Sequence, residues 1–187
     1  YMPMLKRHVD LYIRDTVDPD TGLVRTDRSF SGTKDSVIRY GAFYDNVVMW
    51  KTLQLAQQLR ITPENNQSLD QLKQKIIETF WLPQEGYFLE DSTDLAKKEK
   101  HYSSDWLIAL MTGFLSPQNK QEQEYFTRSI AYIRKEKLDA PFGLKYQSAA
   151  QKSILHLPLR LFAPTYGTQA IWSHWGMEFI KLLTSLY

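Results

Sequence analysis

Residues 31–59, SGTKDSVIRYGAFYDNVVMWKTLQLAQQL, join a polar loop directly to a long apolar run. The loop carries Lys34, Asp35 and Arg39, and Gly41 separates it from the run, which contains neither Pro nor Gly. A rigid helix fixes the loop that precedes it, so this arrangement is typical of a scaffold that presents chemical groups. The segment therefore predicts a buried helix at about 41–59 with a functional loop at its start.

On both sides of this segment the chain alternates between two kinds of helix. One apolar stripe, typical of a surface helix, is present at about 3–15, 68–81 and 119–137. Helices that are apolar on more than one side are predicted at about 41–59, 103–113 and 168–186. A glycine turn with a short extended piece lies between the two helices of each pair, at Gly22, Gly86 and Gly143.

This order predicts an all-α fold of helical hairpins, with short extended pieces in the loops. Alternating surface and buried helices suggest two concentric layers, as in a toroid with an inner and an outer ring. Three hairpins make about half of a six-hairpin (α/α)6 toroid, and residues 1–187 are long enough for one domain. We therefore expect a single portion of a larger chain, whose uncovered inner helices are covered by the remainder of the barrel or by a second copy.

Composition excludes several classes of protein. The formal net charge is +2, from 23 basic and 21 acidic residues spread along the chain, so neither a nucleic-acid footprint nor a membrane anchor is expected. There is no cysteine, and the four histidines lack metal-ligand spacing, so no metal site and no cofactor is expected. No apolar run reaches the roughly 18 residues of a membrane span, and no signal peptide is visible, which leaves the compartment open.

Three short motifs resemble those of the six-hairpin glycosidases, the family of trehalases, processing α-glucosidases and amylo-α-1,6-glucosidase-like enzymes. SGTKDSVIRY (31–40) resembles their Ser-Gly-x-Asp-x-x-x-Arg-aromatic loop with one residue inserted before the Asp, and KDS (34–36) is similar to the Lys-Asp-Ser of the amylo-glucosidase relatives. FGLKY (142–146) is similar to a glycine turn before a late inner helix. YGTQAIWSH (166–174) resembles Tyr-(His/Gln)-Asn-Gly-x-(Ile/Val)-Trp-Pro, and departs from it at Thr168, Gln169 and Ser173.

The resemblance implies an inverting glycoside hydrolase that acts on α-glucosides or related oligosaccharides. Asp35 takes the role of the general acid. An inverting enzyme also needs a carboxylate base roughly 6.5–9.5 Å from the acid, and in the family this base lies further towards the C-terminus than residue 187, with Glu178 as a weak candidate within the chain. The side chains expected to bind substrate are Arg39, Tyr40, Tyr44, Asp45, Asp105, Tyr166, Trp172 and His174.

Other interpretations remain open for these residues. Asp35 and Arg39 can form a loop ion pair of small energetic consequence, and Asp45 and Asp105 can satisfy free N–H groups at helix starts. The tryptophans, including Trp172, can serve the core, since large helical cores also use aromatic residues heavily. The alternative function is a non-catalytic toroid module that binds carbohydrate or packs against another domain. Sugar epimerisation ranks last, because it calls for paired histidines and only His101 and His174 are well placed.

Overall fold

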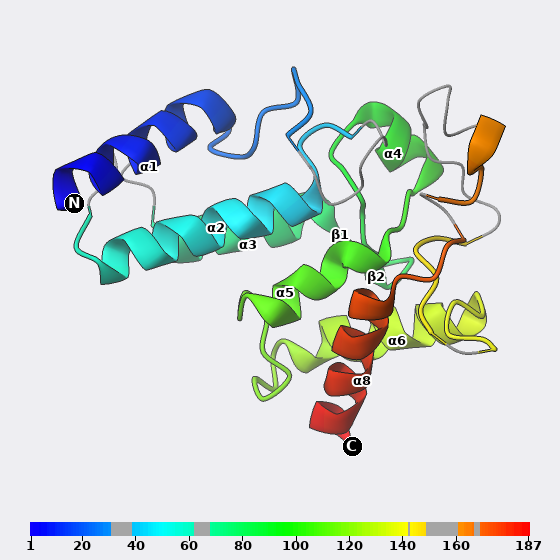
Figure 1. Ribbon diagram of the computed structural model, residues 1–187. Helices are drawn as coiled ribbons and strands as arrows, with labels where there is room; N and C mark the ends of the chain where they lie inside the picture. Colours follow the sequence, from blue (N-terminus) through cyan, green and yellow to red (C-terminus); the bar gives the residue numbers. More distant parts are fainter. Residues whose placement is uncertain (31–38, 62–67, 142, 149–160, 167–168) are drawn as a thin grey trace.

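A computed structural model describes residues 1–30, 39–61, 68–141, 143–148, 161–166 and 169–187 (Figure 1). Most of these residues are helical, which confirms the all-α class, and the extended pieces are short. The helices are α1 (Met2–Thr16), α2 (Phe43–Gln58), α3 (Leu69–Phe80), α4 (Asp94–Glu99), η1 (Ser104–Leu107), α5 (Ile108–Met111), α6 (Gln123–Lys135) and α8 (Ser173–Leu186). The strands are β1 (Trp81–Leu82) and β2 (Tyr87–Phe88), which pair antiparallel.

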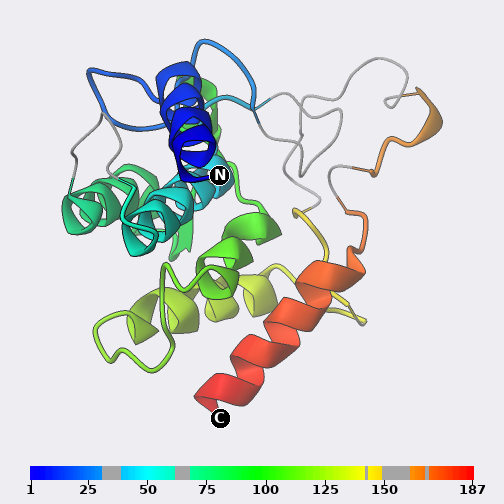
Figure 2. The ribbon, with the colours of Figure 1, turned by 60° about the vertical axis from the view of Figure 1, so that its left-hand side comes forward.

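The helices predicted to be buried on more than one side lie side by side. α2 contacts α5, and α5 contacts α8, so these three helices form a row (Figures 1 and 2). The predicted surface helix α3 packs against α2, and α6 packs against β2. No helix among the described residues has both the length and the apolar character needed to cross a bilayer.

The first half of α2 is buried on several sides, as its sequence predicts. Phe43 is its first residue, and the Phe43 ring stacks on Phe88 at a centroid distance of 4.6 Å and meets the ring of Phe80 edge-on at 5.5 Å. The second half differs from the prediction, because Leu55 and Leu59 are 46% and 50% exposed. Figure 1 shows this half of α2 extending past the end of α5, so it has a neighbour on fewer sides.

The surface helices have the single apolar stripe that their sequences predict. In α3 the buried residues are Leu72, Ile76, Ile77 and Phe80. Helix α6 starts four residues later than the predicted 119, because polar side chains hold a turn before it. In that turn Asn119 Oδ1 accepts from the backbone N–H of Gln121 at 3.0 Å.

Helix α8 also starts later than predicted, at Ser173 instead of 168. The reason is a β-bridge between Ile171 and Lys145, which keeps the residues before the helix extended. The predicted burial of α8 nearly all round is found on one side only. Trp175, Phe179 and Leu182 are buried, while Met177 and Ile180, apolar residues of the same helix, are exposed.

The described chain repeats one arrangement three times. We define unit 1 as residues 2–58, unit 2 as 69–111 and unit 3 as the described part of 123–186. In each unit the chain turns after its first helix, and a residue beyond the glycine turn donates a backbone hydrogen bond back to a residue near the end of that helix. The acceptor is the last helical residue in units 1 and 2, and in unit 3 it lies three residues after the end of α6. The three bonds run from Arg25 N–H to Thr16 C=O (2.9 Å), from Leu89 N–H to Phe80 C=O (2.8 Å) and from Lys145 N–H to Leu138 C=O (2.9 Å).

A second backbone bond joins each unit to the next. The residue after Leu89 is Glu90, and its C=O accepts from the N–H of Phe43, the first residue of α2, at 3.0 Å. The residue after Lys145 is Tyr146, and its C=O accepts from the N–H of Ser104, the first residue of η1, at 2.9 Å. We call α2, η1 with α5, and α8 the second helix segments of units 1, 2 and 3. The second helix segment of units 1 and 2 is therefore fixed at its start by the extended piece of the following unit.

Gly41, which separates the loop from α2, occupies a position where any side chain would be crowded. Its φ is +55°, and an added Cβ would lie 2.7 Å from Ser92 Oγ and 2.9 Å from Thr26 Cγ2. We expect Gly41→Ala to lower the free energy of unfolding by more than Gly113→Ala. Gly113 also has a positive φ, of +72°, but an added Cβ there meets nothing within 4 Å.

Gly113→Ala therefore isolates the cost of the left-handed backbone, about 1–2 kcal/mol. Gly41→Ala adds the cost of overpacking, about 1–3 kcal/mol. Urea denaturation followed by circular dichroism measures both values. Equal losses in the two variants would show that the space around Gly41 relaxes freely.

Candidate functional site

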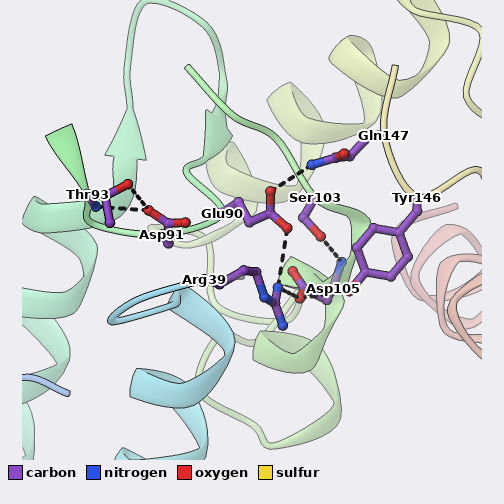
Figure 3. A network of polar contacts seen from close by, with 8 residues as sticks. All are labelled: Arg39, Glu90, Asp91, Thr93, Ser103, Asp105, Tyr146 and Gln147. Atoms are coloured by element: carbon purple, nitrogen blue, oxygen red, sulfur yellow. Dashed lines mark hydrogen bonds and ion pairs between the residues drawn. The ribbon is translucent and has the colours of Figure 1, made fainter. Parts of the chain in front are cut away.

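A buried cation ends the polar loop that the sequence singles out. Arg39 follows residues 31–38, and its side chain is 1% exposed. Its Nη1 donates to Oδ2 of Asp105 and lies 3.5 Å from Oε1 of Glu90 (Figure 3). A buried guanidinium is tolerated only when it is paired and hydrogen-bonded, so these two carboxylates are what allow Arg39 to lie in the interior.

Asp105 is held from two further directions. It lies in the first turn of η1, and its backbone N–H donates to Ser103 Oγ, the side chain that caps this helix, at 3.5 Å. The phenol of Tyr146 donates to Asp105 Oδ2 at 2.9 Å. The same carboxylate oxygen thus accepts hydrogen bonds from both a guanidinium and a phenol.

Glu90 is the second carboxylate of the group and follows strand β2. Its Oε2 accepts from Gln147 Nε2 at 2.7 Å, and its backbone N–H donates to His101 C=O at 2.8 Å. Backbone and side chain are therefore both fixed. We call Arg39, Glu90, Asp105, Tyr146 and Gln147 the Arg39 network.

The Arg39 network brings together all three units. Arg39 comes from unit 1, Glu90 and Asp105 from unit 2, and Tyr146 and Gln147 from unit 3 (Figure 3). All five side chains are buried. The network therefore lies where the three units meet.

Electrostatics inside the network favour one set of protonation states. Burial alone would lower the pKa of Arg39, but Asp105, Tyr146 and Glu90 raise this pKa above its ordinary value. Burial and the neighbouring Asp105 carboxylate raise the pKa of Tyr146 well above 10. Arg39 is therefore charged and Tyr146 is a neutral hydrogen-bond donor at every physiological pH.

Asp91 lies beside the network but not in it. Its side chain points away from that of Glu90 (Figure 3), as expected for successive residues of an extended segment. Burial is the largest influence on Asp91 and raises its pKa, although its Oδ1 accepts from Thr93 N–H at 2.9 Å and from Thr93 Oγ1 at 2.5 Å. The surroundings of Asp91 thus raise the pKa of its carboxyl group.

Raised tyrosine pKa values predict a loss of stability in alkali. Burial raises the pKa of Tyr12 and of Tyr132 to about 12, and raises those of Tyr87 and Tyr102 as well. A raised pKa in the folded state stabilises the fold fully below pH 10, where the unfolded chain is also protonated. That stabilisation is lost as the pH rises from about 10 to about 12, by about 1.4 kcal/mol per pH unit for a tyrosine that ionises only on unfolding.

Unfolding free energies measured by urea denaturation between pH 8 and pH 11 test this expectation. Tyr12→Phe should make the decline above pH 10 shallower. Tyr187→Phe is the control, because Tyr187 is 87% exposed. A parent protein whose stability stays constant through pH 11 would contradict the expectation.

The residues predicted from the sequence do not all lie together. Asp35, the predicted general acid, lies outside the described residues. Arg39 and Asp105 are the two predicted substrate-binding residues that the structure places in the Arg39 network. Tyr40 and Asp45 are half-buried around the start of α2.

The predicted residues Tyr166, Trp172 and His174 lie near the start of α8. Together with Trp175, which was not predicted as a site residue, they form a group that we call the aromatic cluster. The ring of Trp172 lies 5.3 Å from that of Tyr166 and 5.7 Å from that of His174, and the ring of His174 lies 4.6 Å from that of Trp175. Tyr44 meets Trp175 edge-on at 6.4 Å. Within the cluster, His174 is exposed, Trp172 is half-buried and Trp175 is in the core.

The aromatic cluster adjoins the Arg39 network. The ring of Trp172 lies 5.7 Å from that of Tyr146, whose phenol donates to Asp105. A polar, charged interior is therefore continuous with an aromatic group that reaches the surface at His174. Aromatic side chains and fixed polar groups, two of the components of ligand sites, are therefore adjacent here.

Two candidates from the sequence are located elsewhere. Glu178 pairs with Lys181 at 2.5 Å and lines an open cavity of about 430 Å³ beside Leu110 and Met111, which shares no residue with the Arg39 network. His101 contacts Glu99 at 3.1 Å, whereas the described ring contacts of His174 are with Trp172 and Trp175. Among the described residues, no three His, Asp or Glu side chains are grouped as metal ligands would be.

Sequence reasoning did not single out Glu90, Tyr146 or Gln147 as site residues. Glu90 and Tyr146 occupy matching positions beyond the glycine turns, each one residue after the donor of the turn-closing bond. An alignment of the units on their glycines would not have shown this correspondence, because Glu90 stands four residues after Gly86 and Tyr146 stands three after Gly143. The signal that the sequence does contain is the place of Glu90 directly after the apolar residues Tyr87, Phe88 and Leu89.

Comparisons with known proteins do not extend these observations. No family model matches the chain, and searches of curated proteins and of solved structures find no significant match. The assignment of function therefore depends on the residues and on their geometry.

Proposed function

We propose that this chain forms about half of a six-hairpin α/α toroid and acts in an inverting glycoside hydrolase on α-glucosides or related oligosaccharides. The observation that carries the proposal is the buried anchoring of Arg39 by units 2 and 3. Arg39 stands four residues after Asp35 in the sequence, so one end of the segment with the proposed acid is fixed to the interior. A loop whose end is fixed in this way can hold a catalytic group in a defined position.

The proposed chemistry is a single displacement by water. Asp35, as the general acid, gives its proton to the leaving glycosidic oxygen, and a carboxylate base takes a proton from the water that attacks the anomeric carbon from the opposite face. The C–O bond to the leaving group breaks as the new C–O bond forms, so the anomeric configuration inverts. Arg39 acts by holding its segment in place, since its buried guanidinium is engaged by Asp105 and Glu90.

The aromatic cluster is the proposed place for a sugar ring. Trp172 is half-buried and His174 is exposed, so an apolar face and a polar ring edge are available together. Sugars present both C–H faces and hydroxyl groups, and aromatic residues with a polar atom suit such mixed surfaces. Tyr166 lies next to Trp172 and adds a phenol to this proposed subsite.

Turnover of a panel of glucosides tests the proposal. The full chain is incubated with α-1,4- and α-1,6-linked glucose disaccharides, trehalose and the matching β-linked sugars. We expect glucose to be released from α-linked substrates, with the β-anomer appearing first in the proton NMR spectrum. Release from β-linked sugars alone, or an α-anomer as first product, would overturn the proposed reaction.

A second candidate, a non-catalytic carbohydrate-binding module, is favoured by the state of the described carboxylates. Glu90 and Asp105 are buried and each accepts from two side chains of the network, so neither is available to activate water. Calorimetric titration with the same sugars separates the candidates. Saturable binding without any product would favour the module, whereas product formation would exclude it.

A further inference from the structure

The backbone bonds that join neighbouring units also identify which backbone groups have no such bond in the first and the last of the three units. Between units 1 and 2 the bond runs from Phe43 N–H to Glu90 C=O, and between units 2 and 3 from Ser104 N–H to Tyr146 C=O. Each bond uses the first N–H of a second helix segment and the C=O of the residue after the turn-closing donor. The same two positions exist in the units at the ends of the row.

One end has a donor at this position and the other end has an acceptor. Ser173 is the first residue of α8, so its N–H corresponds to those of Phe43 and Ser104. Thr26 follows Arg25, so its C=O corresponds to those of Glu90 and Tyr146. Within the described ranges, no hydrogen bond involves Ser173 N–H or Thr26 C=O, and both residues are exposed.

The side chains near the open donor follow the same correspondence. Counted from the residue before each helix, Ala42 and Trp172, Met177 of α8 matches Val47 of α2 and Ile180 matches Trp50. Val47 and Trp50 are buried, whereas Met177 and Ile180 are 60% and 61% exposed. The apolar side chains are therefore present on α8, but the neighbour that covers their counterparts on α2 is not.

On α2 that neighbour includes the first helix of the next unit. The indole Nε1–H of Trp50 donates to the C=O of Leu69, the first residue of α3, at 3.1 Å. Counted back from the helix ends, Phe80 and Thr16, the counterpart of Leu69 on α1 is Leu5. Leu5 is an apolar side chain that is 38% exposed.

We propose that the α8 end of one copy docks onto the α1 end of a second copy of this chain. The α8 end comprises Met177, Ile180 and the N–H of Ser173, and the α1 end comprises Leu5 and the C=O of Thr26. This contact continues the packing found between units 1 and 2, with a donor opposite an acceptor and apolar side chains opposite each other. Figures 1 and 2 show α1 and α8 on opposite sides of α5, so one copy can use both ends.

A second copy is the occupant that the structure favours because both halves of the contact belong to this chain. The contact is head-to-tail, and such contacts close into a ring when the rotation between copies permits it. Two copies contribute six units, the number in the proposed toroid. The count of two therefore rests on the proposed fold, whereas the docking of the two ends does not.

Analytical ultracentrifugation of the full chain at a series of concentrations tests the docking. We expect a species of twice the 22.0 kDa chain mass that dissociates on dilution. A mass of 22.0 kDa at every concentration would overturn the proposal, whatever the outcome of the sugar assays. Larger open polymers would retain the docking but overturn the count of two.

Two variants distinguish a head-to-tail contact from a symmetric one. Ile180→Asp disables the α8 end and Leu5→Asp disables the α1 end, and circular dichroism checks that each variant is folded. Each variant alone should be monomeric, since either one lacks half of every contact. A mixture of the two should again form a species of twice the chain mass, because the intact α8 end of one variant meets the intact α1 end of the other.

Leu95→Asp is the matched control. Leu95 is also an exposed leucine on a helix, at 43% exposure, but it lies on α4 and belongs to neither end. This variant should associate as the parent does. If Leu5→Asp associates normally while Ile180→Asp does not, the contact joins two α8 ends and the proposed pairing is wrong.

Discussion

Arg39→Met is expected to lower the free energy of unfolding by about 3–5 kcal/mol, the usual cost of breaking a buried ion pair by removing one partner. The variant keeps a side chain of similar length but leaves Glu90 and Asp105 without the guanidinium that lies between them. Both carboxylates are buried, so neither can recover its hydration. Urea denaturation at pH 7 measures the loss directly.

Two comparisons separate lost charge pairing from lost packing. Arg14→Met is the control for a surface arginine, because the Arg14 side chain is 68% exposed and pairs with the exposed Asp15; its expected cost is below about 1 kcal/mol. The triple variant with Arg39→Met, Glu90→Gln and Asp105→Asn removes the uncompensated charges and should regain much of the stability. Equal losses for Arg39→Met and Arg14→Met would show that the buried pairing contributes little.

The second large effect is expected on turnover. Asp35→Asn should reduce kcat for α-glucosides by about 10²–10⁴-fold, the usual contribution of a general acid. The amide keeps the size of the carboxyl group, so the dissociation constant for sugar should change little. Stopped assays of glucose release and calorimetric titration measure the two quantities on one preparation.

Asp20→Asn provides the control for this loss. Asp20 is an exposed carboxylate of the turn that precedes Gly22, so its change should leave both kcat and sugar affinity unaltered. An Asp35→Asn variant that hydrolyses glucosides as fast as the parent would remove Asp35 from the role of acid. If the parent itself binds sugar without turnover, the binding-module interpretation is preferred and Asp35→Asn should not alter that binding.

Local patterns predicted the helices well because side-chain periodicity is a local property. The stripe of Leu72, Ile76 and Phe80 is enough to define α3 and its buried face. Periodicity does not indicate, however, which other elements pack against a helix. For this reason the exposure of Leu55 on α2 and of Ile180 on α8 differed from what their apolar character predicted.

The candidate site was predictable only in part, for a similar reason. Arg39 and Asp105 were both singled out, yet as separate ligands and not as a pair, because 66 positions separate them in the chain. Glu90 is one acidic residue among 21 Asp and Glu residues, and the apolar residues that precede it do not indicate which groups pair with its carboxylate. Its role follows from its position beside Arg39 and Gln147, which is a property of the tertiary structure.

The meeting of three units on one guanidinium also affects how the protein comes apart. Arrays of similar units usually unzip from an end, since each unit contacts only its immediate neighbours. Here the detachment of unit 3 would withdraw Tyr146 from Asp105 and Gln147 from Glu90, and so weaken the surroundings of a charge that belongs to unit 1. Unfolding of unit 3 therefore destabilises unit 1 as well. For this reason the three units are expected to unfold in a single cooperative transition.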